Sequence, residues 1–390
     1  KGIAPKIFEG SDGVGGRIKT DKEDGFLFDQ GFQVLLTAYP EAQKYLDFDA
    51  LDLHFFEPGA IIYGPNGMYK VEDPLRKPTR AINALLSPVG TLADKWKMWR
   101  LTNLVKSKSI DEIFKSPSIS TAEYLNRWGF SEKMITNFLQ PFFSGIFLEN
   151  KLSTSSRIFE FVFKMFTHGN AAIPAKGMQA IPEQLRGKLK KTTIEFGKKV
   201  SSISKKKLLF ADGSSSNFDT LIIATHPSQI TPDYKSVNEF QKTVNLYFDI
   251  PVAKGEAFIG LFPASGNLIN NCCIVSNVAS GYAPDGHSLI SASLVGIPEM
   301  EEKDMIQQAK EELSVTFSLP ADDIKLLRSY VIPHALPLVV EPSIELDAQQ
   351  IQLSDGVFLA GDYLMNGSLN AAMASGRICA NTVLKYLENH

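Results

Sequence analysis

The segment IFEGSDGVGGRIKT, residues 7–20, constrains the fold of this chain more than any other stretch. It places an acidic residue, Glu9, at the end of a short apolar run, and Gly13, Gly15 and Gly16 follow closely. Glycine carries no Cβ, so a backbone rich in it can approach a pyrophosphate. An acidic residue at a strand end can accept hydrogen bonds from ribose hydroxyls in a dinucleotide-binding fold.

Arg17 supports the same interpretation, because its guanidinium offers a permanently charged fork to phosphates. Taken alone, the letters GVGGR also suit a glycine-rich surface turn with a solvated arginine. The choice between a phosphate-binding loop and a surface turn therefore depends on the rest of the chain.

Three blocks read as alternating strands and helices. The first is a strand at residues 6–8, and the second spans about residues 174–228. The third begins at residue 356, where the strand VFLA leads through Gly361 and Asp362 to a helix from about residue 368. Apolar residues of that helix recur at intervals of three and four, which predicts one buried stripe: Leu369, Ala372, Met373, Ala380, Val383, Leu384 and Leu387.

The second block begins with a predicted helix in MQAIPEQLRGKLKK. Strands follow near residues 200–203, 208–210 and 220–224. Asp212-Gly213 lies between apolar runs, and this dipeptide predicts a hairpin.

Two insertions separate the blocks. Residues 61–173 read as mostly helical and rich in Trp and Phe, and residues 231–345 contain alternating segments and a helix near 299–317. We therefore predict an α/β protein with a doubly wound, Rossmann-like domain interrupted by a second, α+β domain. The first domain comprises residues 1–60, 174–230 and 346–390, and the second comprises residues 61–173 and 231–345.

Composition excludes several classes of partner and site. The net charge of −3 gives no electrostatic reason to expect a nucleic-acid partner. The six histidines and three cysteines show no metal-ligand spacing, so no metal site is predicted. The cysteines form no disulfide framework and no apolar run reaches the ~18 residues of a spanning helix, which favours a cytoplasmic protein.

Several segments together resemble one known family. FEGSDGVGGRIKT followed by FDQGFQVL is similar to the E-x-x-x-x-x-GGR-x-x-T segment of the FAD-dependent amine oxidase superfamily. That group includes monoamine oxidases, protoporphyrinogen oxidase, phytoene desaturases and carotenoid isomerases. GVFLAGDYLMNGSLNAAMASGR resembles its second flavin signature, and VSSI with LIIATHP resembles its middle segment. The resemblance covers all three α/β blocks, whereas the insertions match only in position and general character.

The resemblance implies a FAD site assembled from all three blocks. It places Glu9 at the adenosine ribose, and Gly15, Gly16 and Arg17 along the pyrophosphate. It places Gln30, Gly31, Phe32 and Gln33 beside the ribityl chain and isoalloxazine, and Val200 and Ala224 near the adenine side. It places Gly361 and Asp362 at the ribityl–phosphate region, and Ser368, Leu369 and Asn370 at the N1–C2=O edge of the flavin.

The last placement has a physical basis. Reduced flavin carries negative charge at this edge, and a helix N-terminus presents unpaired N–H groups and partial positive charge. The effect is ~0.3–1 kcal/mol when exposed and up to ~2 when partly buried, which would raise the reduction potential modestly. Alternatively, Ser368 caps a structural helix, and both roles are compatible.

Two departures from the family pattern matter. Only eight residues precede Glu9, so the first strand, the G-x-G-x-x-G turn and most of the first helix are missing here. We expect an N-terminally incomplete copy; a complete protein of this sequence would bind flavin very weakly. Ser368 occupies the position of a cage tyrosine in monoamine oxidases, and no cysteine lies between residues 355 and 374, so any FAD should be non-covalent.

The expected function is that of a FAD-dependent oxidoreductase that removes hydride from a C–H bond of a small, hydrophobic molecule. The aromatic stretches Phe138–Phe147 and Phe159–Phe166 could line an apolar tunnel or an entrance at a membrane surface, although helical spacing favours ordinary core. Peripheral membrane contact is therefore one prediction. No catalytic base stands out, and Tyr363 is a candidate for the pocket wall. No feature indicates a particular oligomeric state.

The sequence leaves two alternative functions open. The first is use of reduced flavin without net redox, as in carotenoid isomerases. The second is a binding or structural protein that has lost the cofactor.

Overall fold

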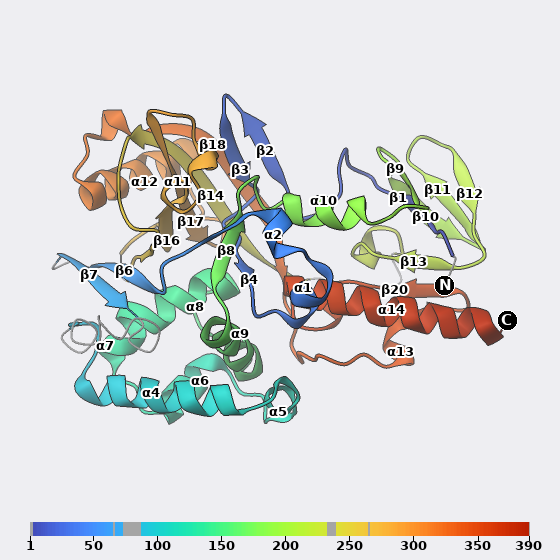
Figure 1. Cartoon of the computed structure of the whole chain (residues 1–390), viewed down its shortest axis with the longest axis horizontal. Helices are drawn as coiled ribbons and strands as arrows, with labels where there is room; N and C mark the ends of the chain where they lie inside the picture. Colours follow the sequence, from blue (N-terminus) through green and yellow to red (C-terminus); the bar gives the residue numbers. More distant parts are fainter. Residues whose placement is uncertain (1–2, 65–66, 73–86, 232–238, 264–265, 390) are drawn as a thin grey trace.

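The computed structural model describes residues 3–64, 67–72, 87–231, 239–263 and 266–389 (Figure 1). Two small sheets of the α/β part each contain one parallel pair of strands. In one, β1 (Lys6–Phe8) pairs with β9 (Thr193–Glu195). In the other, β20 (Val357–Leu359) lies between β13 (Leu221–Ile223), which is parallel to it, and β19 (Gln352–Ser354), which is antiparallel.

The predicted hairpin was assigned the wrong partner strand. β10 (Val200–Ser204) and β11 (Lys207–Phe210) form at the predicted positions and pair with each other, but β11 turns at Asp212-Gly213 into the polar strand β12 (Ser215–Asn217). The apolar strand β13 instead joins β20. The turn signal was correct, and the polar strand was missed because its three residues show no apolar alternation.

The helix after β20, α14 (Leu369–Asn389), forms where predicted, but its buried stripe is not the predicted one. Ala372, Ala380 and Leu387 are exposed. The buried face consists of small or polar residues: Asn370, Ala371, Ala374, Ser375, Cys379 and Val383. Small side chains let the helix approach the end of β20, where the Gly361 N–H donates to Ser375 Oγ at 3.0 Å.

Both insertions contribute to one seven-stranded sheet, in the order β18-β14-β17-β16-β15-β6-β7. The strands are β6 (Gly59–Gly64), β7 (Gly67–Glu72), β14 (Phe240–Pro251), β15 (Ile259–Leu261), β16 (Asn271–Ile274), β17 (His287–Val295) and β18 (Lys325–Pro337).

Alternate residues of β14 face different cores, as the two-residue period of a strand requires. Leu246 and Phe248 pack against α12 (Glu302–Phe317), and Tyr247 packs on the opposite face. The sheet therefore has α12 on one face and the main core on the other.

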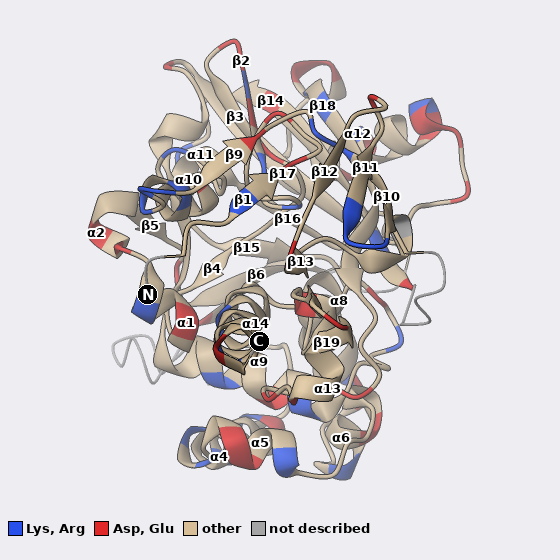
Figure 2. Ribbon diagram, turned by 90° about the vertical axis from the view of Figure 1, so that its right-hand side faces the viewer, with Lys and Arg blue, Asp and Glu red and all other residues tan. Residues whose placement is uncertain are grey.

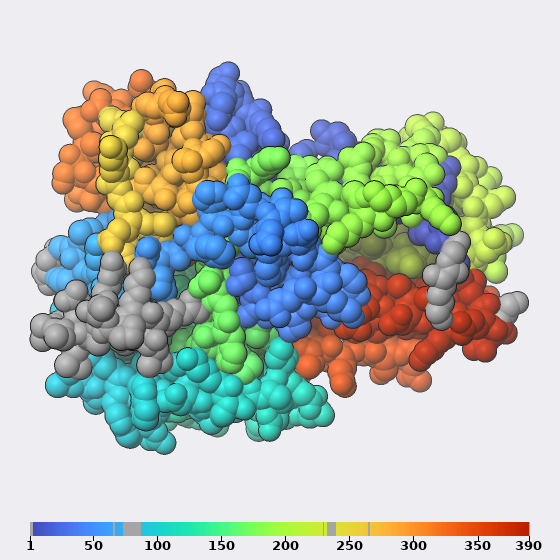
Figure 3. All heavy atoms as spheres, viewed as in Figure 1, coloured from blue at the N-terminus to red at the C-terminus, as the bar shows by residue number. Residues whose placement is uncertain are grey.

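The helical unit contains α4 (Leu92–Ser107), α5 (Ile110–Lys115), α6 (Thr121–Arg127), α7 (Glu132–Met134), α8 (Gln140–Phe147) and α9 (Ser156–His168), with a π-helical turn at Ile135–Leu139. Capping boxes at Thr91–Asp94 and Ser109–Glu112 start α4 and α5. Figures 2 and 3 show α4 to α6 along the lower edge of the molecule.

Shorter elements link these parts. The hairpin β2 (Thr20–Glu23) with β3 (Phe26–Asp29) follows the glycine loop. A small sheet joins β4 (Leu35–Leu36), β5 (Leu53–Phe55) and β8 (Ala171–Pro174). The short helices are α1 (Pro40–Tyr45), α2 (Phe48–Leu51), α10 (Ala180–Gly187), α11 (Val275–Val278) and α13 (Ala348–Ile351). The helix predicted in MQAIPEQLRGKLKK is α10, which ends before the residues KLKK.

Asp29, at the end of β3, connects its own hairpin to the segment before α10 and to the seven-stranded sheet. Its buried carboxylate accepts hydrogen bonds from Thr20 Oγ1, the Met178 N–H and Tyr282 Oη at 2.5, 2.9 and 2.8 Å. Tyr247 Oη of β14 donates to the Asp29 carbonyl at 2.8 Å. Burial raises the pKa of this carboxyl, and the hydrogen bonds oppose that rise.

None of the helices in the described part of the chain is long and apolar enough to cross a bilayer.

Candidate active site

A cavity of about 1090 Å³ lies between the α/β elements and the seven-stranded sheet. Its volume exceeds the ~300–1,000 Å³ of most small-molecule pockets, so there is room for a large ligand or for two. Twelve residues singled out in the sequence line it: Glu9, Gly15, Gly16, Arg17, Phe32, Gln33, Ala224, Gly361, Asp362, Tyr363, Ser368 and Leu369.

Gly15 and Gly16 of the glycine loop both have positive φ angles, but they differ in the space around them. Gly15 has φ +119°, and an added Cβ would lie 2.3 Å from the Ile18 carbonyl oxygen and 2.8 Å from Pro182 Cγ. Gly16 has φ +59°, and nothing lies within 4 Å of its hypothetical Cβ. Gly15 is thus required by the fold, whereas Gly16 presents open backbone to the cavity.

Glu9 stands at the start of this loop. Its N–H extends the pairing of β1 by donating to the Glu195 carbonyl at 2.9 Å. Oε1 accepts the Ser11 N–H at 2.8 Å, which fixes the carboxylate at the cavity wall.

Arg17 and Asp362 form an ion pair across the cavity wall. Nη2 lies 2.5 Å from Asp362 Oδ1, and Nη1 donates to the Ala335 carbonyl at 2.9 Å. The Asp362 side chain is 9% exposed and that of Arg17 is 41% exposed. The guanidinium is therefore anchored on both sides while it remains accessible from the cavity.

Gln33 is hydrogen-bonded to the backbone of Arg17. Its Nε2 donates to the Arg17 carbonyl at 2.9 Å. Its Oε1 is buried and has no hydrogen-bond partner among the described residues. A buried orphan acceptor in a cavity wall suits a ligand that brings a donor.

The N-terminus of α14 opens onto the same cavity through Ser368 and Leu369. Ser368 Oγ accepts the Ala371 N–H at 3.0 Å and donates to Asn366 Oδ1 at 2.7 Å, so it caps the helix. Within the described chain, no hydrogen-bond acceptor meets the backbone N–H of Leu369 or Asn370. These two donors are free for a ligand.

Four of the predicted residues do not line the cavity. Gln30 donates from Nε2 to Asp21 at 3.1 Å, and Gly31 lies against Ile332. Val200 packs in an apolar cluster with Ile203 and Leu221. The Asn370 side chain is buried, and its Oδ1 accepts the Glu41 N–H at 3.0 Å.

Asn370 and Glu41 together attach α1 to α14. The Glu41 carboxylate pairs with Arg377 at 2.7 Å. The side chain of Asn370 is therefore structural, and only its backbone N–H remains a candidate for flavin contact.

The remaining walls of the cavity are mainly apolar. They come from α8, α9, β15 and the segment after β18, and they include Phe142, Ile146, Phe147, Leu148, Ile158, Val162, Phe166, Leu261, Val339 and Val340. Among the described lining residues the carboxylates are Glu9 and Asp362, and the permanent cation is Arg17. The charges are thus confined to the part of the cavity predicted to hold the dinucleotide.

The aromatic stretches serve both as core and as cavity wall. Phe143, Phe159 and Phe161 are almost fully buried. Phe142 and Phe166 line the cavity, with ring centroids 5.4 Å apart.

Tyr363 belongs to an aromatic row on the wall. Its ring centroid lies 5.1 Å from that of His226, His226 lies 5.3 Å from Phe240, and Phe240 lies 5.1 Å from His334. All four side chains line the cavity and connect the α/β elements with β14 and β18.

Asn271, in β16, was not identified from the sequence. It is 5% exposed and lines the cavity, yet its side chain makes no hydrogen bond within the described chain. Gly145 of α8 makes room for it, because an added Cβ there would lie 3.0 Å from Asn271 Oδ1. The sequence signal that could have identified Asn271 is a polar residue in an otherwise apolar strand.

Leu148 was also missed. It ends α8 with φ +56°, a left-handed conformation that costs a non-glycine residue ~1–2 kcal/mol. Its side chain lines the cavity, so the strained backbone positions a wall residue. No sequence signal marks it, since a helix end of this kind usually carries glycine.

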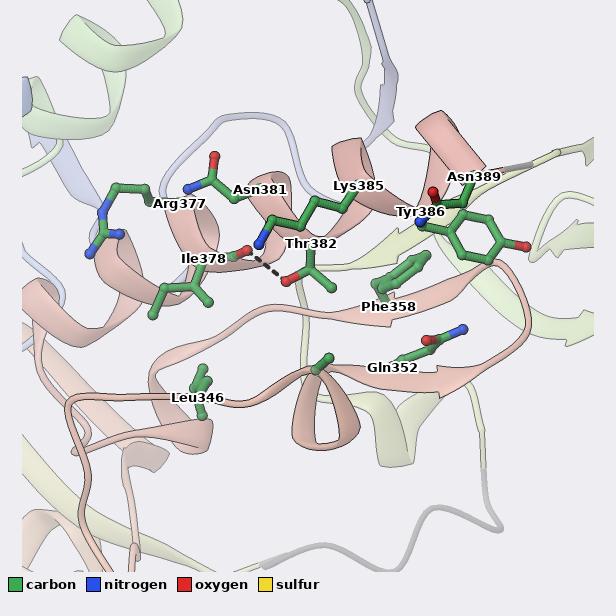
Figure 4. Close-up of a pocket in the computed structure, with 11 residues that line it drawn as sticks. Leu346, Gln352, Phe358, Arg377, Ile378, Asn381, Thr382, Lys385, Tyr386 and Asn389 are labelled. Atoms are coloured by element: carbon green, nitrogen blue, oxygen red, sulfur yellow. Dashed lines mark hydrogen bonds between the residues drawn. The ribbon is translucent and has the colours of Figure 1, made fainter.

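A second hollow of about 480 Å³ lies between α14 and the strands β19 and β20 with α13 (Figure 4). Leu346, Phe358 and Ile378 form an apolar floor, and Lys385 and Asn381 lie at its rim. It shares no residue with the large cavity. In the described chain, no cluster of His, Cys, Asp and Glu could hold a metal ion.

The chain is similar to known proteins over almost its whole length. A family model described as flavin containing amine oxidoreductase matches residues 1–384. Among curated proteins, the chain is similar to protoporphyrinogen oxidase 2, chloroplastic/mitochondrial, of Arabidopsis thaliana, with 26% identity over 147 residues. This match spans 37% of the chain and 28% of the length of that relative.

Solved structures match the whole fold. An oxidoreductase from Methanosarcina mazei has a TM-score of 0.72 at 16% identity, over 99% of this chain and 94% of that one. Wild-type putrescine oxidase bound to putrescine has a TM-score of 0.67 at 12% identity, over 99% and 94%. The predicted fold class is confirmed, and at this identity the likeness shows the fold alone.

Proposed function

This chain belongs to the flavin containing amine oxidoreductase family, a family of FAD-dependent oxidoreductases, and on that premise we propose that it binds FAD non-covalently and oxidises a largely apolar small molecule that carries no cationic group. The oxidation removes a hydride from a C–H bond, and the resulting substrate cation then loses a proton to solvent, so the product has the same charge as the substrate. FAD, once bound, supplies the acceptor for that hydride.

The polar groups of the cavity suit FAD. Glu9 would accept hydrogen bonds from the adenosine ribose, and Arg17 would bind the pyrophosphate beside the open backbone of Gly16. The Leu369 and Asn370 N–H groups would bond the N1–C2=O edge, and the orphan Oε1 of Gln33 would accept a ribityl hydroxyl or ring N–H. No described cysteine lines the cavity, which supports non-covalent binding.

One observation supports the substrate class: the apolar part of the cavity contains no carboxylate among its described residues. A cationic amine buried there would lose its hydration without gaining a counter-charge, which costs several kcal/mol. An extended polyene or the ring system of a macrocyclic substrate carries no cation, so it loses little on entering. The walls from α8 and α9 would exclude water and orient the C–H bond, so no catalytic base is required.

The test begins with purified protein reconstituted with FAD. Its flavin absorbance is followed anaerobically after mixing with protoporphyrinogen, with a cis-polyene such as a carotene, or with putrescine. We expect protoporphyrinogen or the polyene to bleach the flavin and putrescine to leave it oxidised. Bleaching by putrescine alone would overturn the assignment of an apolar substrate.

The two alternatives give different results in the same assay. Isomerisation of the cis-polyene by pre-reduced protein, without an electron acceptor, would indicate flavin use without net redox. A colourless protein that rejects added FAD would indicate a cofactor-free role.

A further inference from the structure

The outer face of α4 is unusually apolar for a surface helix. Leu92, Trp96 and Trp99 have relative exposures of 68%, 56% and 53%. At 100° per residue these positions fall on one side of the helix, and Leu104, 40% exposed, lies on its flank. The opposite side, with Leu101 and Val105, is buried against the helical unit. We call the residues Leu92, Trp96, Trp99 and Leu104 the α4 stripe.

Exposed tryptophan needs an explanation, because Trp is highly buried on average. The chain contains three tryptophans, and two of them lie in this stripe. Figure 3 shows the region of α4, coloured cyan, on the outer lower edge of the molecule. A contiguous exposed apolar face commonly marks an interaction surface.

The charges beside the stripe are basic. Lys95, Lys97, Arg100 and Lys106 lie on α4. The carboxylate of its one acidic residue, Asp94, is buried and accepts hydrogen bonds from the N–H groups of Thr91 and Ser131. The Arg100 guanidinium stacks over the Trp96 ring, 4.8 Å from its centroid. The surface thus combines tryptophan with cations.

We propose that the α4 stripe docks on the surface of an anionic phospholipid bilayer. Trp is enriched at membrane–water interfaces, and helices with an apolar face flanked by Lys and Arg lie in the plane of that interface. Basic side chains near an anionic leaflet strengthen such binding. This surface is distinct from the cavity, and the proposal does not depend on the substrate.

A second copy of the chain fits the stripe less well. A symmetric contact would place the same face on both subunits and bring the basic side chains together. Like charges at such a contact are repulsive, whereas an anionic surface attracts them.

The test uses the full chain with Trp128→Phe, so that only Trp96 and Trp99 remain fluorescent. Vesicles of phosphatidylcholine and phosphatidylglycerol are added, with and without brominated lipid. We expect co-flotation with the vesicles, a blue shift and quenching by bromine, each weakened by high salt. Pure phosphatidylcholine should bind less.

Two variants separate the contributions. The double variant Trp96→Ser, Trp99→Ser, made in the natural Trp128 background, should lower vesicle affinity at least about tenfold. Arg100→Glu with Lys106→Glu should do so by about tenfold for anionic vesicles only. Val315→Ser is the matched control, because Val315 is an apolar residue of α12 that is 83% exposed and lies outside the α4 stripe. This variant should bind vesicles as the unsubstituted protein does.

Absence of flotation and of quenching would overturn the proposal. It would also be overturned if the chain were dimeric without lipid and the Trp96→Ser, Trp99→Ser variant were monomeric, because the stripe would then be a subunit interface. Neither result bears on oxidation, since FAD binding and substrate turnover are measured separately.

Discussion

The guanidinium of Arg17 lies 2.5 Å from the carboxylate of Asp362, although the two residues are 345 positions apart in the chain. This contact joins the glycine loop to the turn after β20. It brings together the two segments that the sequence marked as flavin signatures. The site is thus built from both ends of the chain, and Arg17 is the cation at their junction.

Arg17→Ala should weaken FAD binding. Hydrogen bonds to charged groups contribute about 1.5–3 kcal/mol, and the 41% exposure of Arg17 places it at the lower end, so we expect about a tenfold rise in Kd. Titration of apoprotein with FAD, followed by flavin fluorescence, measures it. Lys198→Ala, which removes an ion pair with Asp212 outside the cavity, is the control. Unchanged affinity in Arg17→Ala would show that the phosphates bind elsewhere.

The neighbouring glycines should respond differently to the same substitution. Gly15→Ala forces a Cβ to within 2.3 Å of the Ile18 carbonyl, so both the thermal stability of the apoprotein and FAD affinity should fall. Gly16→Ala meets no atom, so it should lower stability only by about 1 kcal/mol, the cost of its left-handed conformation. Its main effect should be on FAD affinity. Equal losses of stability in both variants would contradict this distinction.

The local patterns of the sequence predicted much of the α/β part. The strand before Glu9, the Asp212-Gly213 turn and the start of α14 each depend on a few adjacent residues, and each forms where expected. The buried face of α14 was predicted wrongly because close packing against β20 selects small and polar residues. That is a tertiary requirement which apolar periodicity does not encode.

The apolar walls of the cavity were harder to foresee. Phe142 lines the cavity and its neighbour Phe143 lies in the core, although both residues are phenylalanine. Which of them faces the ligand depends on how α8 lies between α9 and the seven-stranded sheet. Asn271 and Leu148 are functional candidates for the same reason, since only the assembled fold places them at the cavity.

Asn271→Leu should separate stability from function. The change removes a buried amide without hydrogen bonds, so the melting temperature should stay the same or rise. If the substrate carries a polar group that meets Asn271, kcat/KM should fall about tenfold or more, roughly the value of one hydrogen bond. Protoporphyrinogen, the probe proposed above, provides the assay.

Asn245 is the matched control for Asn271. It is buried in β14 of the same sheet, separated from β16 by β17, but its Oδ1 accepts hydrogen bonds from Ser291 and Ser293 at 3.1 and 2.7 Å. Asn245→Leu should therefore destabilise the protein by about 1–3 kcal/mol and leave kcat/KM unchanged. A loss of stability in Asn271→Leu equal to that in Asn245→Leu would mean that Asn271 is structural.

Asp94 predicts how the helical unit responds to acid. Burial tends to raise the pKa of its carboxyl, but hydrogen bonds from Ser131 and Thr91 outweigh burial and lower the pKa to about 2. A carboxyl with a depressed pKa stabilises the fold above its unfolded pKa, 3.8, and loses that contribution as pH falls toward 2. The contribution is on the order of 2 kcal/mol.

Thermal melts of the wild type should therefore show a loss of stability between pH 4 and pH 2 that Asp94→Asn lacks, because the variant has already lost the contribution at neutral pH. Asp111→Asn, at an exposed ion pair with Lys115 on α5, should follow the wild-type pH profile, since such pairs contribute little. Parallel profiles for wild type and Asp94→Asn would show that acid acts elsewhere. Asp94 also accepts a hydrogen bond from the N–H of Ser131, the residue that caps α7. Protonation of Asp94 in acid should therefore weaken the attachment of α4 to α7.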